Sequence, residues 1–134
     1  MLKSSIWIVL VLLILLTFNP ACSTTEEADP FSVLGNWSIT LLYQGGYEYA
    51  GTITFAGSNA SGAVTCTVSP TWTSGTATGT GTYTVSGSTV NFTIYWPDAG
   101  YTDTCTGTTT TDNSMNGTLI ETPGDVPGTW TCSR

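Results

Sequence analysis

From Trp37 to Arg134, apolar side chains recur at every second position in short segments that turn-forming residues separate. A period of two is the pattern of a half-buried β-strand, with one face on the core and the other in water. Eight such segments follow one another, and no stretch after residue 22 shows a helical period. The pattern therefore predicts an all-β domain of eight strands.

The side chains expected to face inward share one phase in each segment. In chain order they are Trp37, Ile39, Leu41, Tyr43; Tyr49, Gly51, Ile53, Phe55; Val64, Cys66, Val68; Ala77, Gly79, Gly81, Tyr83, Val85; Val90, Phe92, Ile94, Trp96; Tyr101, Asp103, Cys105, Gly107; Met115, Gly117, Leu119; and Trp130, Cys132, Arg134. Short connections let sequential strands pair, whereas a Greek key needs a long crossover. We expect an eight-stranded antiparallel up-and-down barrel. A β-sandwich is the alternative, which pairing of the first and last strands would exclude.

Composition agrees with an all-β surface that carries little charge. Charged residues make up 8% of the chain, against roughly 25% in an average soluble domain. Threonine, with 28 residues, suits strands because its branched carbon packs on the pleated surface while its hydroxyl stays solvated. Lys3 and Arg134 are the only cations against nine acids. Binding to nucleic acid or to anionic lipid headgroups is therefore not expected.

The first 21 residues have the pattern of an export signal. Lys3 precedes an apolar run from Ile6 to Phe18, which is shorter than the ~20 residues of a membrane-spanning helix. Ala21 then precedes Cys22, and this arrangement resembles a bacterial lipoprotein signal, although Asn19 stands where that family usually has Leu. The resemblance implies a lipid on Cys22 and, with Ser23 next, an outer-membrane anchor facing the periplasm or the cell surface. Ordinary cleavage after Ala21 and an uncleaved anchor helix are the alternatives.

Residues 22–33 form an acidic tether, and 34–134 form the expected barrel domain.

The opening Gly35-Asn36-Trp37, the eight-strand meander and Arg134 resemble the lipocalin (calycin) superfamily, especially small bacterial lipocalin-like domains. The resemblance implies that Gly35 and Trp37 start the first strand at a closed end and that Arg134 packs over the tryptophan, a cation–π contact. With about 100 residues and no helix, the domain is shorter than typical lipocalins.

Connections in a meander alternate between the two ends of the barrel, so the first, third, fifth and seventh share one rim. We expect a ligand-binding rim there, because six aromatic residues fall at or near it: Tyr43, Tyr47, Tyr49, Trp72, Trp96 and Tyr101. Trp72 is the sharpest candidate, because it lies in a loop with no strand phase to bury it. The alternative is that these aromatics only pack the barrel end. Five acids lie near the same rim: Glu48, Asp98, Asp103, Glu121 and Asp125. We expect them to be solvated loop residues, and a cation site is the alternative.

Three cysteines remain beyond Cys22, at positions 66, 105 and 132, all on inward faces. None of their strands are neighbours in a meander, and second-neighbour strands lie ~9–10 Å apart, beyond the ~7 Å limit for a disulfide. Both one disulfide and three buried thiols stay open.

Catalytic and metal chemistry lack their usual residues. Without histidine, neither a Ser-His or Cys-His pair nor a Cys/His zinc set exists, and no EF-hand spacing is present. We expect no enzyme, cofactor or metal. The favoured function is an envelope-anchored lipoprotein that binds a small apolar or amphipathic ligand, or a partner, at its aromatic rim. The alternative is a ligand-free structural module whose interior is filled by Tyr83, Phe92, Trp96, Met115 and Trp130.

Overall fold

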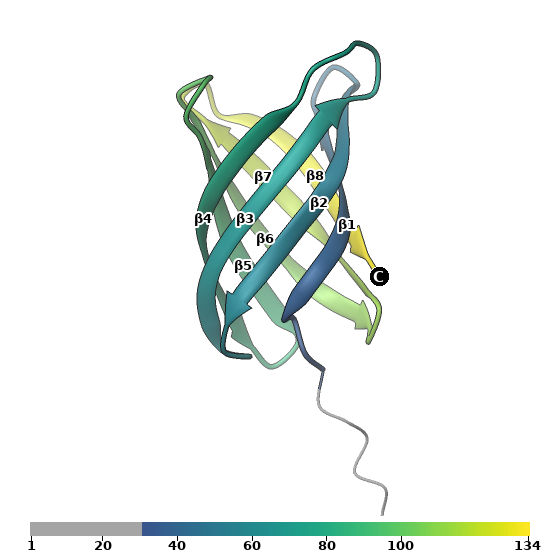
Figure 1. Ribbon diagram of the computed structural model, residues 1–134, viewed down its shortest axis with the longest axis vertical. Helices are drawn as coiled ribbons and strands as arrows, with labels where there is room; N and C mark the ends of the chain where they lie inside the picture. The colour runs from purple at the N-terminus through teal and green to yellow at the C-terminus, as the bar shows by residue number, and fades with distance from the viewer. Residues whose placement is uncertain (1–30) are drawn as a thin grey trace, which may run out of the picture. The chain divides into compact units, whose positions relative to one another are not determined.

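The computed structural model describes residues 31–134, and Phe31–Arg134 is one compact unit. The expected signal segment, Cys22 and most of the tether lie outside the described residues. Eight strands make up nearly all of this unit (Figure 1): β1 Gly35–Tyr43, β2 Tyr47–Gly57, β3 Ser61–Pro70, β4 Ala77–Ser86, β5 Thr89–Trp96, β6 Tyr101–Thr111, β7 Ser114–Thr122 and β8 Val126–Ser133. The described residues contain no helix long and apolar enough to cross a membrane.

The strands form a closed barrel in sequence order, each antiparallel to both neighbours. The closing pair is β1 with β8, in a register that runs from Ser38 opposite Ser133 to Tyr43 opposite Gly128. This pairing excludes the β-sandwich and confirms the predicted fold class. The register follows from the sequence, because a shift by one residue would turn every apolar side chain of a strand outward.

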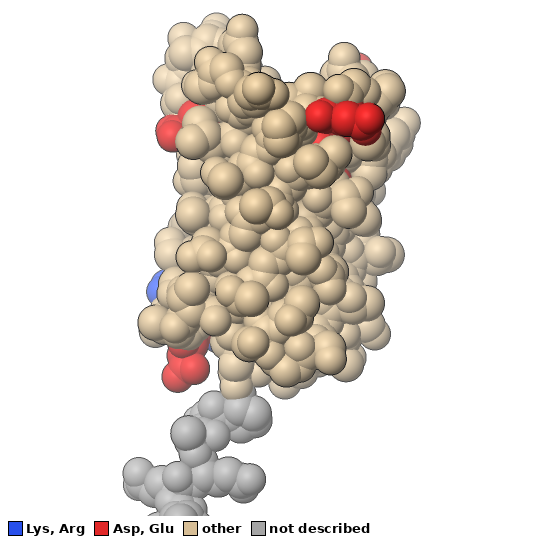
Figure 2. Space-filling model, turned by 180° about the vertical axis from the view of Figure 1, so that it is seen from behind, with Lys and Arg blue, Asp and Glu red and all other residues tan. Residues whose placement is uncertain are grey.

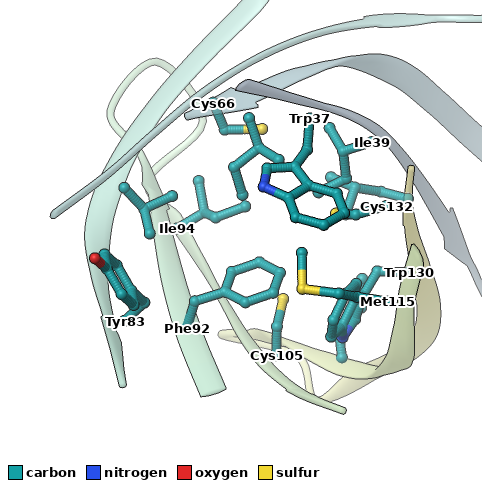
Figure 3. Close-up of a cluster of buried hydrophobic side chains, with 14 of the residues drawn as sticks. Trp37, Ile39, Cys66, Tyr83, Phe92, Ile94, Cys105, Met115, Trp130 and Cys132 are labelled. Carbon is teal, nitrogen blue, oxygen red and sulfur yellow. The ribbon is translucent and has the colours of Figure 1, made fainter. Parts of the chain in front are cut away.

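The inward phase of the strands packs a continuous core (Figure 3). Aromatic rings meet edge to face across the middle of the barrel, with centroids 5.6 Å apart for Phe55 and Phe92 and 4.8 Å apart for Phe92 and Trp130. Tyr83, Phe92, Met115 and Trp130 are at most 2% exposed, so side chains fill the centre. The outer face carries threonine pairs between strands, such as Thr67 with Thr78, which stabilise adjacent strands.

Glycine on the inward face lets neighbouring strands approach closely where the sheet bends. A Cβ on Gly81 would collide with the carbonyl oxygen of Thr93, and one on Gly51 would collide with that of Thr67. Neither glycine has a positive φ, so space, rather than backbone conformation, requires glycine there. A side chain at either position would push the neighbouring strand away.

One end of the barrel is closed by Trp37 and its neighbours. The Trp37 indole donates a hydrogen bond of 2.7 Å to the Val33 carbonyl, and the Arg134 guanidinium lies 4.2 Å from the Trp37 ring centre. Arg134 also donates to the carbonyl oxygens of Ser32, Leu34 and Asp112. Val33, which the sequence pattern assigns to the tether, is fully buried and belongs to the compact unit Phe31–Arg134.

The three cysteines of the described residues are buried free thiols. Burial raises the pKa of the Cys66 thiol to about 12, and it raises the pKa values of Cys105 and Cys132 as well. All three therefore stay protonated and act as small apolar side chains of the core. Of the two possibilities left open by the sequence, the structure shows the one without a disulfide.

Candidate functional site

A pocket of about 440 Å³ opens at the barrel end opposite Trp37 and Arg134. Figure 2 shows this upper end of the molecule hollowed between two lobes. The pocket is lined by the turns that join β1 to β2 and β5 to β6, and by residues near the ends of all eight strands. Its lining residues are Tyr43, Gln44, Tyr47, Tyr49, Val68, Ala77, Trp96, Ala99, Tyr101, Glu121 and Val126. The barrel is thus filled at its centre and hollow at this mouth.

Five of the six aromatic residues expected at the rim line the pocket. Tyr43 and Trp96 lie deepest, at 9% and 6% exposure, whereas Tyr101 and Tyr47 are exposed at the mouth. Tyr43 and Tyr49 meet edge to face, with ring centroids 5.7 Å apart. The aromatic side chains therefore form a wall that runs from the core to solvent.

Trp72, the sharpest candidate from the sequence, is not part of the pocket lining. Its indole is 50% exposed and packs edge to face on Tyr47 and Tyr49, with centroids 5.4 and 5.1 Å away. The prediction that a loop position leaves Trp72 exposed is correct. Its position is nevertheless behind two pocket residues, so it supports the wall from outside.

Asp103 is fully buried, which corrects its assignment to solvated rim acids. Its Oδ2 accepts hydrogen bonds from the Tyr43 hydroxyl at 2.6 Å and from the Trp96 indole at 2.7 Å, and its Oδ1 has no partner within the described residues. Burial raises the pKa of Asp103, and these two hydrogen bonds lower it in part. Asp103 thus lies directly behind two side chains of the pocket wall.

Glu121 brings a second carboxyl group to the same place. It lies opposite Asp103 in the β6–β7 register, and directly opposed residues of an antiparallel pair share one face of the sheet. Glu121 is half-buried and lines the pocket. Burial and the neighbouring Asp103 raise the pKa of Glu121. The remaining rim acids differ in exposure: Asp98 and Asp125 are exposed, and Glu48 is half-buried.

Sequence reasoning missed several pocket residues. Strand phase places Val68 and Ala77 on inward faces close to the rim, and this combination is the signal that could have identified them as pocket residues. Gln44 and Ala99 lie in turns, where no periodicity predicts direction. The Gln44 backbone is fixed by a hydrogen bond of 2.9 Å to the Pro127 carbonyl, a contact between segments far apart in sequence. The described residues contain no group of three or more acidic or cysteine side chains able to hold a metal ion.

Fold and pocket together define a small closed β-barrel with one open mouth. No protein-family model and no curated protein matches the sequence. Solved structures of designed barrels do match. A redesigned β-barrel, mFAP1, solved bound to DFHBI, has a TM-score of 0.68 at 16% identity, over 75% of this chain and 94% of that chain. A fluorescence-activating β-barrel designed de novo has a TM-score of 0.65 at 16% identity, over 75% of this chain and 92% of that chain. Identities this low show a shared fold.

Proposed function

We propose that this protein is a lipocalin-like barrel that binds a small apolar or amphipathic ligand in the pocket at its aromatic mouth. The pocket itself carries the proposal. Its volume of about 440 Å³ lies in the range of small-molecule sites, which favour the mouths of barrels and are mostly apolar with a few polar groups. Val68, Ala77 and Val126 supply aliphatic surface beside the aromatic wall.

The designed barrels support this proposal at the level of the fold. The mFAP1 structure is described as bound to DFHBI, so a barrel of this architecture and similar size is compatible with a bound molecule. A second function has one observation in its favour: side chains fill the barrel centre, as a ligand-free structural module requires. We propose a binding protein rather than an enzyme, because the sequence lacks histidine and the fully buried Asp103 is covered by Tyr43 and Trp96.

Ligand titration with a matched pair of variants tests the pocket. Ala77 lines the pocket, and Ala60 lies exposed in the turn at the other end. A tryptophan at position 77 fills the pocket without creating a cavity, so Ala77→Trp should weaken binding of decanol by about tenfold or more. Ala60→Trp adds the same side chain away from the pocket and should leave binding unchanged. Calorimetric titration of the full-length protein measures both. Equal affinities in the two variants, or no binding by the wild type, would favour the structural module.

We also propose that the barrel is a lipoprotein of a bacterial envelope, held at the outer membrane by a lipid on Cys22. The support is the sequence pattern of residues 1–22, an apolar run followed by Ala21 and Cys22. Metabolic labelling with palmitate should tag the wild type and not Cys22→Ser. Undiminished labelling of Cys22→Ser would overturn the anchor and leave the ligand proposal intact.

A further inference from the structure

The carboxyl groups of the pocket are the feature that a purely apolar ligand leaves unexplained. Asp103 is fully buried, and its Oδ1 has no hydrogen-bond partner among residues 31–134. Glu121, opposite it in the register, lines the pocket. Burying a carboxylate without full pairing costs several kcal/mol. Asp103, behind the pocket wall, and Glu121, on the wall, lie on one face of the sheet. Negative charge on either carboxyl lowers the electrostatic potential of the pocket in front of it.

Within residues 31–134, no positively charged side chain lies near these carboxyl groups. In the part of the chain that the structure describes, Arg134 is the one cation, and its guanidinium is held at the opposite end by Trp37 and by backbone carbonyls. Figure 2 shows acidic atoms on both sides of the upper end of the barrel, and the basic atoms together with one further acidic group toward the lower end. Five of the six described acids belong to the pocket end: Glu48, Asp98, Asp103, Glu121 and Asp125. Such a field attracts cations and repels anions.

The aromatic wall of the pocket also favours a positively charged ligand. The faces of tyrosine and tryptophan rings carry partial negative charge, and cages of such rings are a recurring site for ammonium groups. Tyr43, Tyr49 and Trp96 form the deep part of this wall, next to Glu121. A hydrated metal ion does not suit such a wall, because Ca²⁺ needs six to eight oxygen ligands.

We propose that the ligand is an organic cation, an amine or quaternary ammonium group on an apolar body. The ammonium group lies against Glu121 and the rings of Tyr43 and Trp96, with Asp103 behind them, and the apolar body contacts Val68 and Ala77. This inference rests on the proposed function, because it names the charge of the molecule that the same pocket binds.

The pocket carboxyls also give binding a pH dependence. The titratable groups facing Asp103 are Tyr43 on β1, Cys66 on β3, Cys105 on β6 itself and Glu121 on β7; Trp96 on β5 does not titrate. All are acids, and their protonated forms are neutral, so none adds positive charge. Since the pKa values of Asp103 and Glu121 are raised, affinity for a cation should increase as the pH rises above the usual carboxyl range. Affinity for a neutral ligand should not change.

Three probes with the same ten-carbon chain separate charge from apolar contact: decyltrimethylammonium, decanol and decanoate, each titrated below its micelle concentration. At about pH 8, decyltrimethylammonium should bind the full-length protein about tenfold or more tighter than decanol, and decanoate should bind most weakly. Glu121→Gln and Asp103→Asn should each remove most of this preference, measured as the ratio of the affinities for decyltrimethylammonium and decanol. Glu48→Gln removes a rim charge that does not line the pocket and should change the ratio by less than about threefold.

Equal affinity for decyltrimethylammonium and decanol would overturn the inference and leave the proposed function standing. Failure of all three probes to bind would overturn both. A preference for the cation that Glu121→Gln leaves intact would place the cation elsewhere and overturn the site. Because Gln keeps the size of Glu at a half-buried position, this variant tests the inference even if Asp103→Asn does not fold.

Discussion

Replacing Asp103 by Asn should stabilise the barrel at neutral pH and flatten the pH dependence of its stability. Asn has the shape of Asp, and its side-chain oxygen can accept the hydrogen bonds from Tyr43 and Trp96 without carrying charge. Its amide nitrogen takes the place of the unpartnered Oδ1. The number of unpaired buried groups is therefore unchanged, and the substitution removes a buried negative charge.

The expected change in the free energy of unfolding follows from two opposing effects on the Asp103 carboxylate. Burial of a carboxylate costs several kcal/mol, and each charge-assisted hydrogen bond returns about 1.5–3 kcal/mol. Burial has the larger effect on the carboxylate and the two hydrogen bonds the smaller, so the pKa of Asp103 is raised. A raised pKa in the folded state stabilises the protein fully below the unfolded pKa, near 3.9, and this stability is lost as the pH rises through the folded pKa. Relative to Asp103→Asn, the wild type should lose on the order of 1–3 kcal/mol from about pH 3 to pH 8.

Urea unfolding followed by tryptophan fluorescence, repeated across this pH range, measures the effect. Glu121 is present in both proteins, so the rise of its pKa that is due to burial cancels in the difference, whereas the rise that is due to the Asp103 charge is part of the measured effect. Asp98→Asn, in an exposed turn, is the control and should change the free energy of unfolding by no more than about 0.5 kcal/mol at any pH. An Asp103→Asn variant that is less stable than the wild type at pH 8, with an unchanged pH profile, would refute the reasoning.

Three further predictions concern the closed end and the core. Arg134→Met should lower the free energy of unfolding by about 1–3 kcal/mol in urea titrations, and Arg134→Lys should lower it by less; no loss in either variant would contradict the contact with Trp37. Gly81→Ala should cost about 2 kcal/mol or more, because its methyl group meets the Thr93 carbonyl, whereas the neighbouring exposed Thr82→Ala should cost under about 1 kcal/mol. The core thiols should react with maleimide only as the protein unfolds, which mass spectrometry can follow; rapid labelling of native protein would show them accessible.

The strand phase could be predicted from the sequence because burial on one face imposes a period of two on each strand. Trp37, Ile39 and Leu41 illustrate this, since each lies inward as expected, at 1% exposure or less. The order of strands could also be predicted, because the connections are too short for other pairings. Val33 was missed because it precedes the alternating pattern, and a single apolar residue carries no period.

The chemistry of the pocket could be predicted only in part. The aromatic rim was found because its residues cluster at alternate turns. The environment of Asp103 was not, although its inward phase was recognised, because its partners lie on other strands: Tyr43 is 60 positions away. Trp72 shows the converse, since loop position predicts exposure but does not tell which surface a side chain covers. For both Asp103 and Trp72, contacts with segments that are distant in sequence determine the surroundings of the side chain.

Closure of β1 on β8 limits how other proteins can bind this barrel. Each of the eight strands is hydrogen-bonded on both sides, so the sheet has no free edge to which a further strand could add. Edge strands are the usual templates for intermolecular β-pairing and for aggregation. A protein partner must therefore recognise side chains, on the threonine-covered wall or on the turns at either end. Crowding many copies together should not make them polymerise through their backbones.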